Sequence, residues 1–118
     1  MTRHRVCAHD ELSPGDCRIV EVGGRSIGVY NVNGSLHALL NRCPHGGAPL
    51  CVGIVSGLSS SEGPGRPVQW TKDGEIVRCP WHGWEYDIAT GATVTEPVLR
   101  VKTFPVVVEN GDVLVELA

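Results

Sequence analysis

Two short segments of the chain each bring a cysteine and a histidine close together. The first, which we call box 1, is residues 43–50 and begins Cys-Pro-His-Gly; the second, box 2, is residues 79–84 and begins Cys-Pro-Trp-His-Gly. A thiolate and an imidazole two or three residues apart cannot spread across a fold, so each box can offer both groups to one metal centre from a single loop. The proline after each cysteine stiffens the loop, and the glycine after each histidine permits close backbone approach and positive φ.

In these two boxes the sequence resembles the Rieske family, whose pattern is Cys-x-His in one loop and Cys-x-x-His in a second. The run Cys-Pro-Trp-His-Gly-Trp is similar to the ferredoxins and oxygenase N-terminal domains of bacterial ring-hydroxylating systems, and the resemblance continues through residues 85–91. It implies a [2Fe-2S] cluster with two thiolates on one iron and two imidazoles on the other. The ligands so implied are Cys43 and Cys79 for the first iron, and His45 and His82 for the second, which would lie nearer solvent.

Structural zinc is the alternative interpretation of the same four residues, because two cysteines and two histidines are also a common zinc set. Zinc fingers usually group the two cysteines and then the two histidines, whereas each box here mixes them. The glycines and tryptophans beside the boxes also have no role in a simple zinc site. The sequence therefore favours the iron–sulfur cluster over zinc.

Four further positions bear on the reduction potential that the resemblance implies. Respiratory-type Rieske proteins carry an extra cysteine in each box, and the matching positions here hold Ala48 and Trp81. High-potential relatives also have a serine two residues after the second histidine, where this chain has Trp84. These departures predict a low-potential cluster. Tyr86 matches a tyrosine whose hydroxyl bonds a ligand sulfur in high-potential relatives, although a core aromatic on a strand is an equal interpretation.

Short strands separated by turns are expected on both sides of the boxes. Residues 17–22, 26–32 and 35–40 are β-prone, and residues 113–117 alternate apolar and polar positions as a half-buried strand does. Asn33-Gly34 between two such runs is a hairpin signal, because both central residues of the turn need positive φ. The sequence therefore predicts an all-β fold, with no amphipathic helix longer than about two turns.

A chain of 118 residues has room for one domain, so we expect a single Rieske domain over residues 1–118. Its base would be an antiparallel β-sandwich formed by approximately residues 1–42 and 91–118. A smaller cluster-binding lobe of loops and short strands would occupy approximately residues 43–90.

The stretch between the boxes is longer than is usual in ferredoxins of the family. Its extra length is the segment Ser56–Pro67, whose many Ser, Gly and Pro residues favour an exposed, mobile loop. This segment is either a contact for a particular partner or a tolerated insertion, since loop insertions cost little free energy. The residues Lys72–Glu75 are predicted to form a further turn.

The other candidate residues have simpler interpretations. Residues 7–9 repeat the Cys-x-His spacing but lack the following glycine and a partner box. Trp81 and Trp84 are expected to shield the cluster, with an exposed patch for a partner as the alternative for Trp81. Arg42 and Arg78 precede the two box cysteines and either assist docking or keep strand ends soluble. We expect packing or exposed residues without a function at Cys7, Cys17, Cys51, His4 and His37.

Composition and charge narrow the class of protein. The net charge of −3 gives no sign of nucleic-acid or anionic-membrane binding. No apolar run approaches the roughly 20 residues of a membrane span, and no apolar stretch follows the basic N-terminal residues as in a secretory signal. Five cysteines form an odd set, which favours metal ligation over a disulfide framework. These features predict a cytoplasmic protein.

Electron transfer is the function that these observations predict, with no catalytic residue. The resemblance implies a one-electron carrier that takes electrons from a flavin-dependent reductase and passes them to a terminal oxygenase. Oxygen activation by the chain itself would need a mononuclear iron site, normally two histidines and a carboxylate, and the histidines outside the boxes are scattered through the first third of the sequence. The remaining alternatives are an accessory Rieske subunit, such as that of nitrite reductase, and a structural zinc module.

Overall fold

The computed structural model describes residues 2–44, 46–61, 63–81, 83–94 and 98–117. Over these residues the chain consists of β-strands and two single-turn 3-10 helices, η1 and η2, and none of its helices is long and apolar enough to cross a membrane. In chain order the elements are β1 (Thr2–Ala8), η1 (His9–Glu11), β2 (Cys17–Val22), β3 (Arg25–Val32), β4 (Ser35–Leu40), η2 (Leu50–Val52), β5 (Ile54–Ser61), β6 (Val68–Arg78), β7 (Glu85–Asp87), β8 (Thr103–Phe104), β9 (Val106–Glu109) and β10 (Asp112–Leu117).

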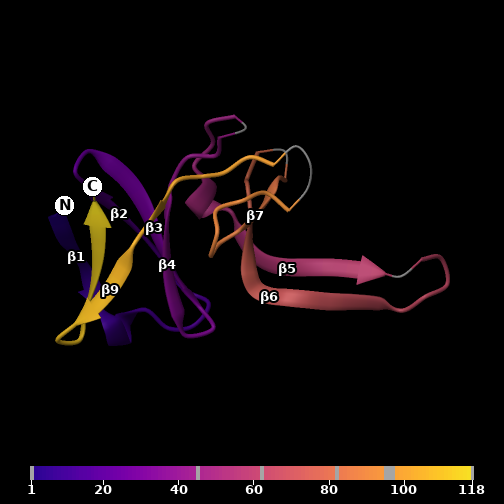
Figure 1. The fold of residues 1–118 in the computed structure, drawn as a ribbon, viewed down its shortest axis with the longest axis horizontal. Coiled ribbons are helices and arrows are strands. Elements are labelled where there is room, and N and C mark those ends of the chain that lie inside the picture. The colour runs from indigo at the N-terminus through magenta and orange to yellow at the C-terminus, as the bar shows by residue number, and fades with distance from the viewer. Residues whose placement is uncertain (1, 45, 62, 82, 95–97, 118) are drawn as a thin grey trace.

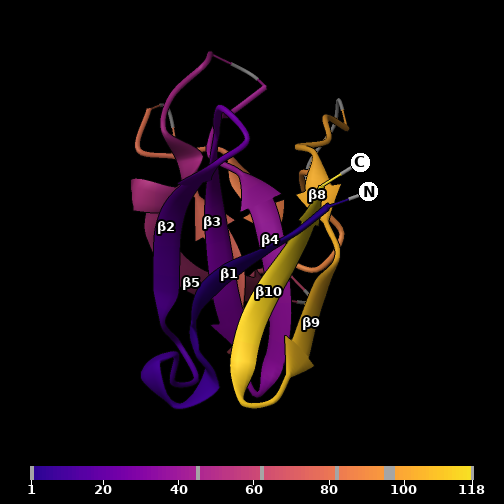
Figure 2. The ribbon, with the colours of Figure 1, turned by 90° about the vertical axis from the view of Figure 1, so that its left-hand side faces the viewer.

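The strands form three antiparallel sheets, as the predicted all-β fold requires. One sheet has the order β1-β10-β9, the second β2-β3-β4-β8, and the third β5-β6-β7. The first two sheets lie face to face (Figure 2), and the third packs on the far side of the second (Figure 1). The first two sheets draw on residues near both ends of the chain, whereas the third uses the middle of the chain.

Strand β3 lies between the two hydrophobic cores, and its sequence shows why. Successive side chains of a strand point to opposite faces. Ile27 and Val29 therefore pack toward the first sheet, while Tyr30 and Val32 belong to the core under the third sheet. Residues 27–32 are all buried, which explains why this strand reads as an almost continuous apolar run instead of alternating.

The hairpin turn predicted at Asn33-Gly34 is confirmed, and a second Asn-Gly turn has the same geometry. Asn33 and Gly34, between β3 and β4, have φ values of 51° and 99°. Asn110 and Gly111, between β9 and β10, have 51° and 79°. Asparagine tolerates the left-handed region better than most residues with a side chain, and glycine adopts it without strain, which is why Asn-Gly marks these turns.

The prediction of a loop over Ser56–Pro67 was wrong for its first half. Residues up to Ser61 belong to β5, which pairs antiparallel with β6 from Ile54↔Arg78 to Ser61↔Val68. Serine has little strand preference of its own, but the ladder of backbone hydrogen bonds to β6 overrides that weak preference. The turn of the hairpin is confined to the residues that follow Ser61.

The turn predicted at Lys72–Glu75 is instead a bulge inside β6. Ser56 pairs with Ile76 and Leu58 pairs with Thr71, so one residue of β5 lies opposite four residues of β6. Lys72 and Gly74 take positive φ values of 53° and 78° there. The sequence Lys-Asp-Gly-Glu favours a chain reversal when considered alone. In the structure the pairing of β5 with β6 continues on both sides of these residues, so the strand bends at the bulge and does not reverse.

The bulge is held by one contact to the second sheet's β3–β4 turn and by one contact within the third sheet. The side-chain amide of Asn33 donates to the Asp73 carbonyl at 3.3 Å, and the Lys72 ammonium lies 3.2 Å from an Asp87 carboxylate oxygen. Beyond these contacts the outer part of the β5–β6 hairpin, residues 57–71, extends away from the body (Figure 1). We call this outer part the arm; with it the molecule measures 51 × 29 × 20 Å.

Candidate metal centre

Each box is a tight loop closed by its own backbone. The N–H of Cys43 donates to the carbonyl of Ala48 at 2.8 Å, and the N–H of Cys79 donates to the carbonyl of Trp84 at 2.7 Å. In both boxes the bond therefore runs from the cysteine to the fifth residue after it. Box 1 follows β4 and box 2 follows β6, so two sheets position the two loops beside each other.

The structure brings the two box cysteines together in the interior. Cys43 is 1% exposed and Cys79 is 2% exposed, and their thiols are close enough to interact. Burial raises the pKa of the Cys79 thiol, the Trp81 backbone N–H lowers it, and the neighbouring Cys43 raises it again. Iron binds the thiolate, so metal binding here would displace a proton that burial otherwise retains. The predicted ligands His45 and His82 lie outside the described residues.

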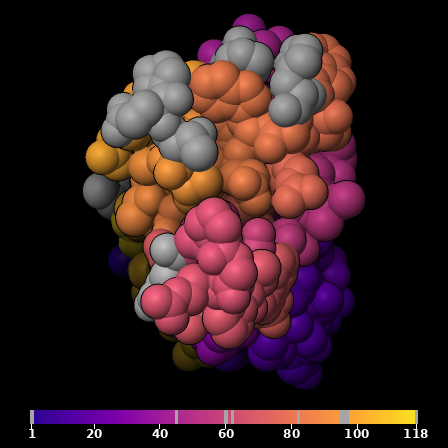
Figure 3. Space-filling model, turned by 90° about the vertical axis from the view of Figure 1, so that its right-hand side faces the viewer, coloured from indigo at the N-terminus to yellow at the C-terminus, as the bar shows by residue number. Residues whose placement is uncertain are grey.

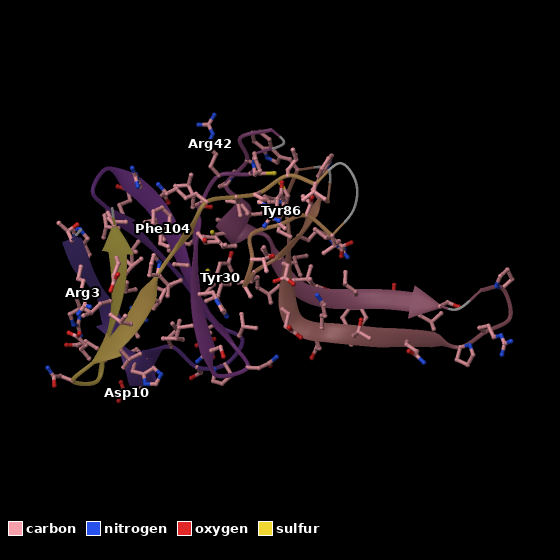
Figure 4. All side chains as sticks on the ribbon, viewed as in Figure 1. Arg3, Asp10, Tyr30, Arg42, Tyr86 and Phe104 are labelled. Atoms are coloured by element: carbon pink, nitrogen blue, oxygen red, sulfur yellow. The ribbon has the colours of Figure 1, made fainter. Side chains whose placement is uncertain are left out.

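Tyr86, labelled in Figure 4, contacts Cys43. The tyrosine is fully buried on β7, and its hydroxyl oxygen is 3.0 Å from Cys43 Sγ. When Cys43 is a thiolate the hydroxyl must be the donor, because a thiolate carries no proton. Of the two interpretations of Tyr86 from the sequence, the core position is present, and so is the contact with the sulfur of Cys43, a predicted ligand.

We expect Tyr86→Phe to lower the midpoint potential by about 40 mV, because losing a hydrogen bond of about 1 kcal/mol to sulfur destabilises the reduced, more negative site. A redox titration followed by absorption measures it. Tyr30→Phe is the matched control: its hydroxyl is equally buried but lies beside Cys17 and Cys51 instead. Equal midpoints for Tyr86→Phe and the unmodified chain would show that the bond has no effect on the potential.

The other residues of the two boxes and their neighbours differ in how far they are exposed. Ala48 in box 1 is buried, and Trp84 in box 2 is half-buried and packs on the core. Trp81 is 50% exposed, which favours the interpretation of this residue as part of an outward-facing patch. Arg42 is exposed at the edge of box 1 (Figure 4), with its guanidinium beside Gly47.

A surface hollow beside box 2 was not expected from the sequence. It has a volume of about 370 Å³ and is lined by the ends of β5 and β6 together with box 2. Val52 and Ile54 are 59% and 68% exposed at its rim, and Cys79 and Pro80 line its wall. Arg78, also in the lining, is 3.4 Å from a Glu85 carboxylate oxygen. The two separated segments that form the hollow gave no signal in the sequence.

The cysteines outside the boxes are packing residues, as predicted for Cys7 and Cys51, which are both buried. Cys17 is only partly buried, with its sulfur 4.0 Å from the Cys51 carbonyl oxygen. Burial raises the pKa of the Cys17 thiol to about 12 and also raises that of the Tyr30 hydroxyl beside it. Thiols with such pKa values are inert at neutral pH. Sequence reasoning missed this grouping, because its members come from β2, β3 and η2.

No alternative metal site is present among the described residues, which omit both box histidines. Within them no three Cys, His, Asp or Glu side chains lie together in a way that could hold a metal. Cys7-Ala8-His9 is split between the end of β1 and η1. The five cysteines are all described and none forms a disulfide.

Comparison with known proteins identifies the fold and the family. The pattern of the Rieske [2Fe-2S] domain matches residues 2–105. The ferredoxin component of the naphthalene 1,2-dioxygenase system of Pseudomonas putida is 30% identical over 94% of this chain and 91% of its own length. The ferredoxin of carbazole 1,9a-dioxygenase from Nocardioides aromaticivorans IC177 superposes with a TM-score of 0.76 at 29% identity, covering 98% of this chain and 97% of that one.

A solved complex of reduced oxygenase and oxidised ferredoxin in carbazole 1,9a-dioxygenase contains a similar chain. That chain matches with a TM-score of 0.75 at 30% identity, over 96% of this chain and 91% of its own length. The family match spans most of the sequence and includes both boxes. The resemblance seen in the two boxes is thereby confirmed, and the chain belongs to the Rieske [2Fe-2S] domain family, whose cofactor is a 2Fe-2S cluster.

Proposed function

We propose that this protein is a one-electron carrier that takes electrons from a flavin-dependent reductase and passes them to a terminal oxygenase. The observation that carries the proposal is the pair of buried, adjacent thiols of Cys43 and Cys79, each held in a self-closed loop. The similarity to ferredoxin components of dioxygenase systems supports the direction of transfer.

Cys43 and Cys79 are the proposed ligands of one iron, and His45 and His82 those of the other. A bound cluster would supply a site that gains and loses a single electron, without bond making. The chain's own part is to fix the sulfurs and limit water around them. Tyr86 holds Cys43 by the 3.0 Å contact, and the backbone bonds of the two loops fix both cysteine N–H groups.

We further propose that residues 1–118 are a single domain that catalyses no reaction by itself. The histidines outside the boxes support this, because His4, His9 and His37 lie on β1, η1 and β4 and do not converge. A cytoplasmic location is part of the same proposal. The five thiols without a disulfide are compatible with that reducing compartment.

A low midpoint potential is the testable consequence of the proposed role. Rieske potentials run from about −150 to +300 mV, and a carrier fed ultimately by a nicotinamide cofactor belongs near the lower end. Trp84 at the position of the missing serine, and Ala48 and Trp81 at those of the missing disulfide, support this placement. A redox titration of the holoprotein should give a one-electron wave near the lower limit. A midpoint above about +100 mV would contradict the proposed direction of electron flow.

A further inference from the structure

One edge of the arm, that of β5, has no partner strand among the residues that the structure describes. β5 pairs only with β6, and β7 pairs with β6 only at residues 76–78, so the outer hairpin is two-stranded. Figure 1 shows it extending from the body, and Figure 3 shows it end-on, as the pink-to-red group in the lower half of the view. A lone two-stranded hairpin is marginally stable in water, and a further strand stabilises it.

Among the edge strands of the described residues, β5 is unusual in lacking protection. Natural proteins discourage edge-to-edge pairing with charged side chains, proline, bulges or very short strands. The edge strands β1, β2, β7 and β9 each carry at least one charged residue, and β8 has two residues. β5 has eight residues, Ile-Val-Ser-Gly-Leu-Ser-Ser-Ser, with neither charge nor proline. On the opposite edge of the arm, that of β6, the segment without a partner strand is limited to Val68–Thr71, between Pro67 and the bulge at Lys72.

One face of the arm carries a rigid aromatic side chain. Trp70 lies opposite Ser59 in the ladder, and its ring lies over Gly57, where an added Cβ would be 2.9 Å from the indole. Its Nε1–H donates to Asp73 Oδ1 at 3.0 Å, so the ring is held from two sides while remaining 56% exposed. Val68 is on the same face and is 71% exposed. Such fixed, exposed aromatic groups are typical anchors of protein interfaces.

We propose that the β5 edge pairs with the β5 edge of a second copy of this chain, giving a four-stranded sheet β6-β5-β5-β6 across a two-fold axis. A two-fold contact sets a surface against itself, so any charge on the edge would face its own kind. β5 has none, and the arm as a whole carries one acidic and one basic residue, Glu62 and Arg66, in its sequence. Small Ser and Gly side chains allow close approach, and the two Trp70 rings then share one face of the sheet.

Light scattering during gel filtration of the holoprotein tests the pairing. At about 100 μM, where weak interfaces are populated, we expect twice the 12.6 kDa chain mass. Ser59→Lys should raise the dimer dissociation constant about fivefold or more, because it sets like charges against each other across the axis. The matched control Gln69→Lys adds the same charge to β6 and should leave the dimer in place. The cluster absorption of each variant reports whether it has folded.

A monomer at that concentration would overturn the proposal, as would a dimer that is insensitive to Ser59→Lys. Hydrogen exchange on the unmodified chain gives a second test that does not depend on a variant folding. Amides of β5 should exchange more slowly in concentrated than in dilute protein, while those of the β1 edge should not change. Equal exchange of β5 at both concentrations would also overturn it. Each outcome is separate from the midpoint potential, so the electron-carrier function is tested independently.

Discussion

Cys79→Ala is expected to abolish cluster binding. The thiol is 2% exposed, lies beside Cys43 and is held in a backbone-closed loop, so its removal leaves one sulfur where the proposed site needs two. Loss of one thiolate from a Cys₂His₂ set leaves the iron incompletely ligated. The purified variant should be colourless, with iron and acid-labile sulfide near zero, whereas the unmodified chain should be coloured.

Cys7→Ala is the matched control for that experiment. Cys7 is as deeply buried, at 1% exposure, but lies in the core between the first two sheets. This variant should keep full iron content and lose only about 1 kcal/mol of unfolding free energy from the small cavity. If Cys79→Ala retained the colour and metal of the unmodified chain, the proposed ligand set would be wrong.

Gly53→Ala should destabilise the protein by about 3 kcal/mol or prevent folding, because a Cβ at this position has no room. An added Cβ would lie 1.9 Å from the Arg78 carbonyl oxygen and 3.0 Å from the Leu50 carbonyl oxygen. Both neighbours are backbone atoms, so relief requires η2 to move away from the end of β6, next to box 2. Urea unfolding followed by tryptophan fluorescence gives the free energy.

Gly24→Ala separates this steric effect from backbone strain. Gly24 has a φ of +76° and no atom within 4 Å of an added Cβ, so only the left-handed backbone opposes the substitution. Gly24→Ala should lower the free energy of unfolding by about 1 kcal/mol. Gly53 has an ordinary φ of −72°, so the loss of stability in Gly53→Ala comes entirely from steric contact. Equal losses of unfolding free energy in the two variants would show that η2 lies farther from β6 than it does in the structure.

The strands near the chain ends could be predicted because their signals are local. Asn33-Gly34 occupies positive φ as predicted, Asn110-Gly111 forms a second turn of the same kind, and Pro105 separates β8 from β9. The boxes could be found for the same reason, since each presents its cysteine and histidine within four residues. Tyr86 was ambiguous in sequence, because its distance to Cys43 depends on how β7 packs against box 1.

What the sequence could not predict depends on pairing between distant segments. The serines of β5 favour a loop when considered alone, and only the ladder to β6 makes them a strand. The grouping of Cys17, Tyr30 and Cys51 likewise requires β2, β3 and η2 to meet. Composition describes each segment separately and therefore contains no signal for such contacts.

Electron paramagnetic resonance of the dithionite-reduced holoprotein, labelled with ¹⁵N-histidine and combined with metal analysis, tests the central claim most directly. Two irons and two sulfides per chain are expected, with hyperfine coupling of the unpaired electron to nitrogens from two histidines. His45→Ala and His82→Ala would assign the two couplings. A colourless protein containing zinc, or a cluster signal without coupling to histidine nitrogen, would contradict the account.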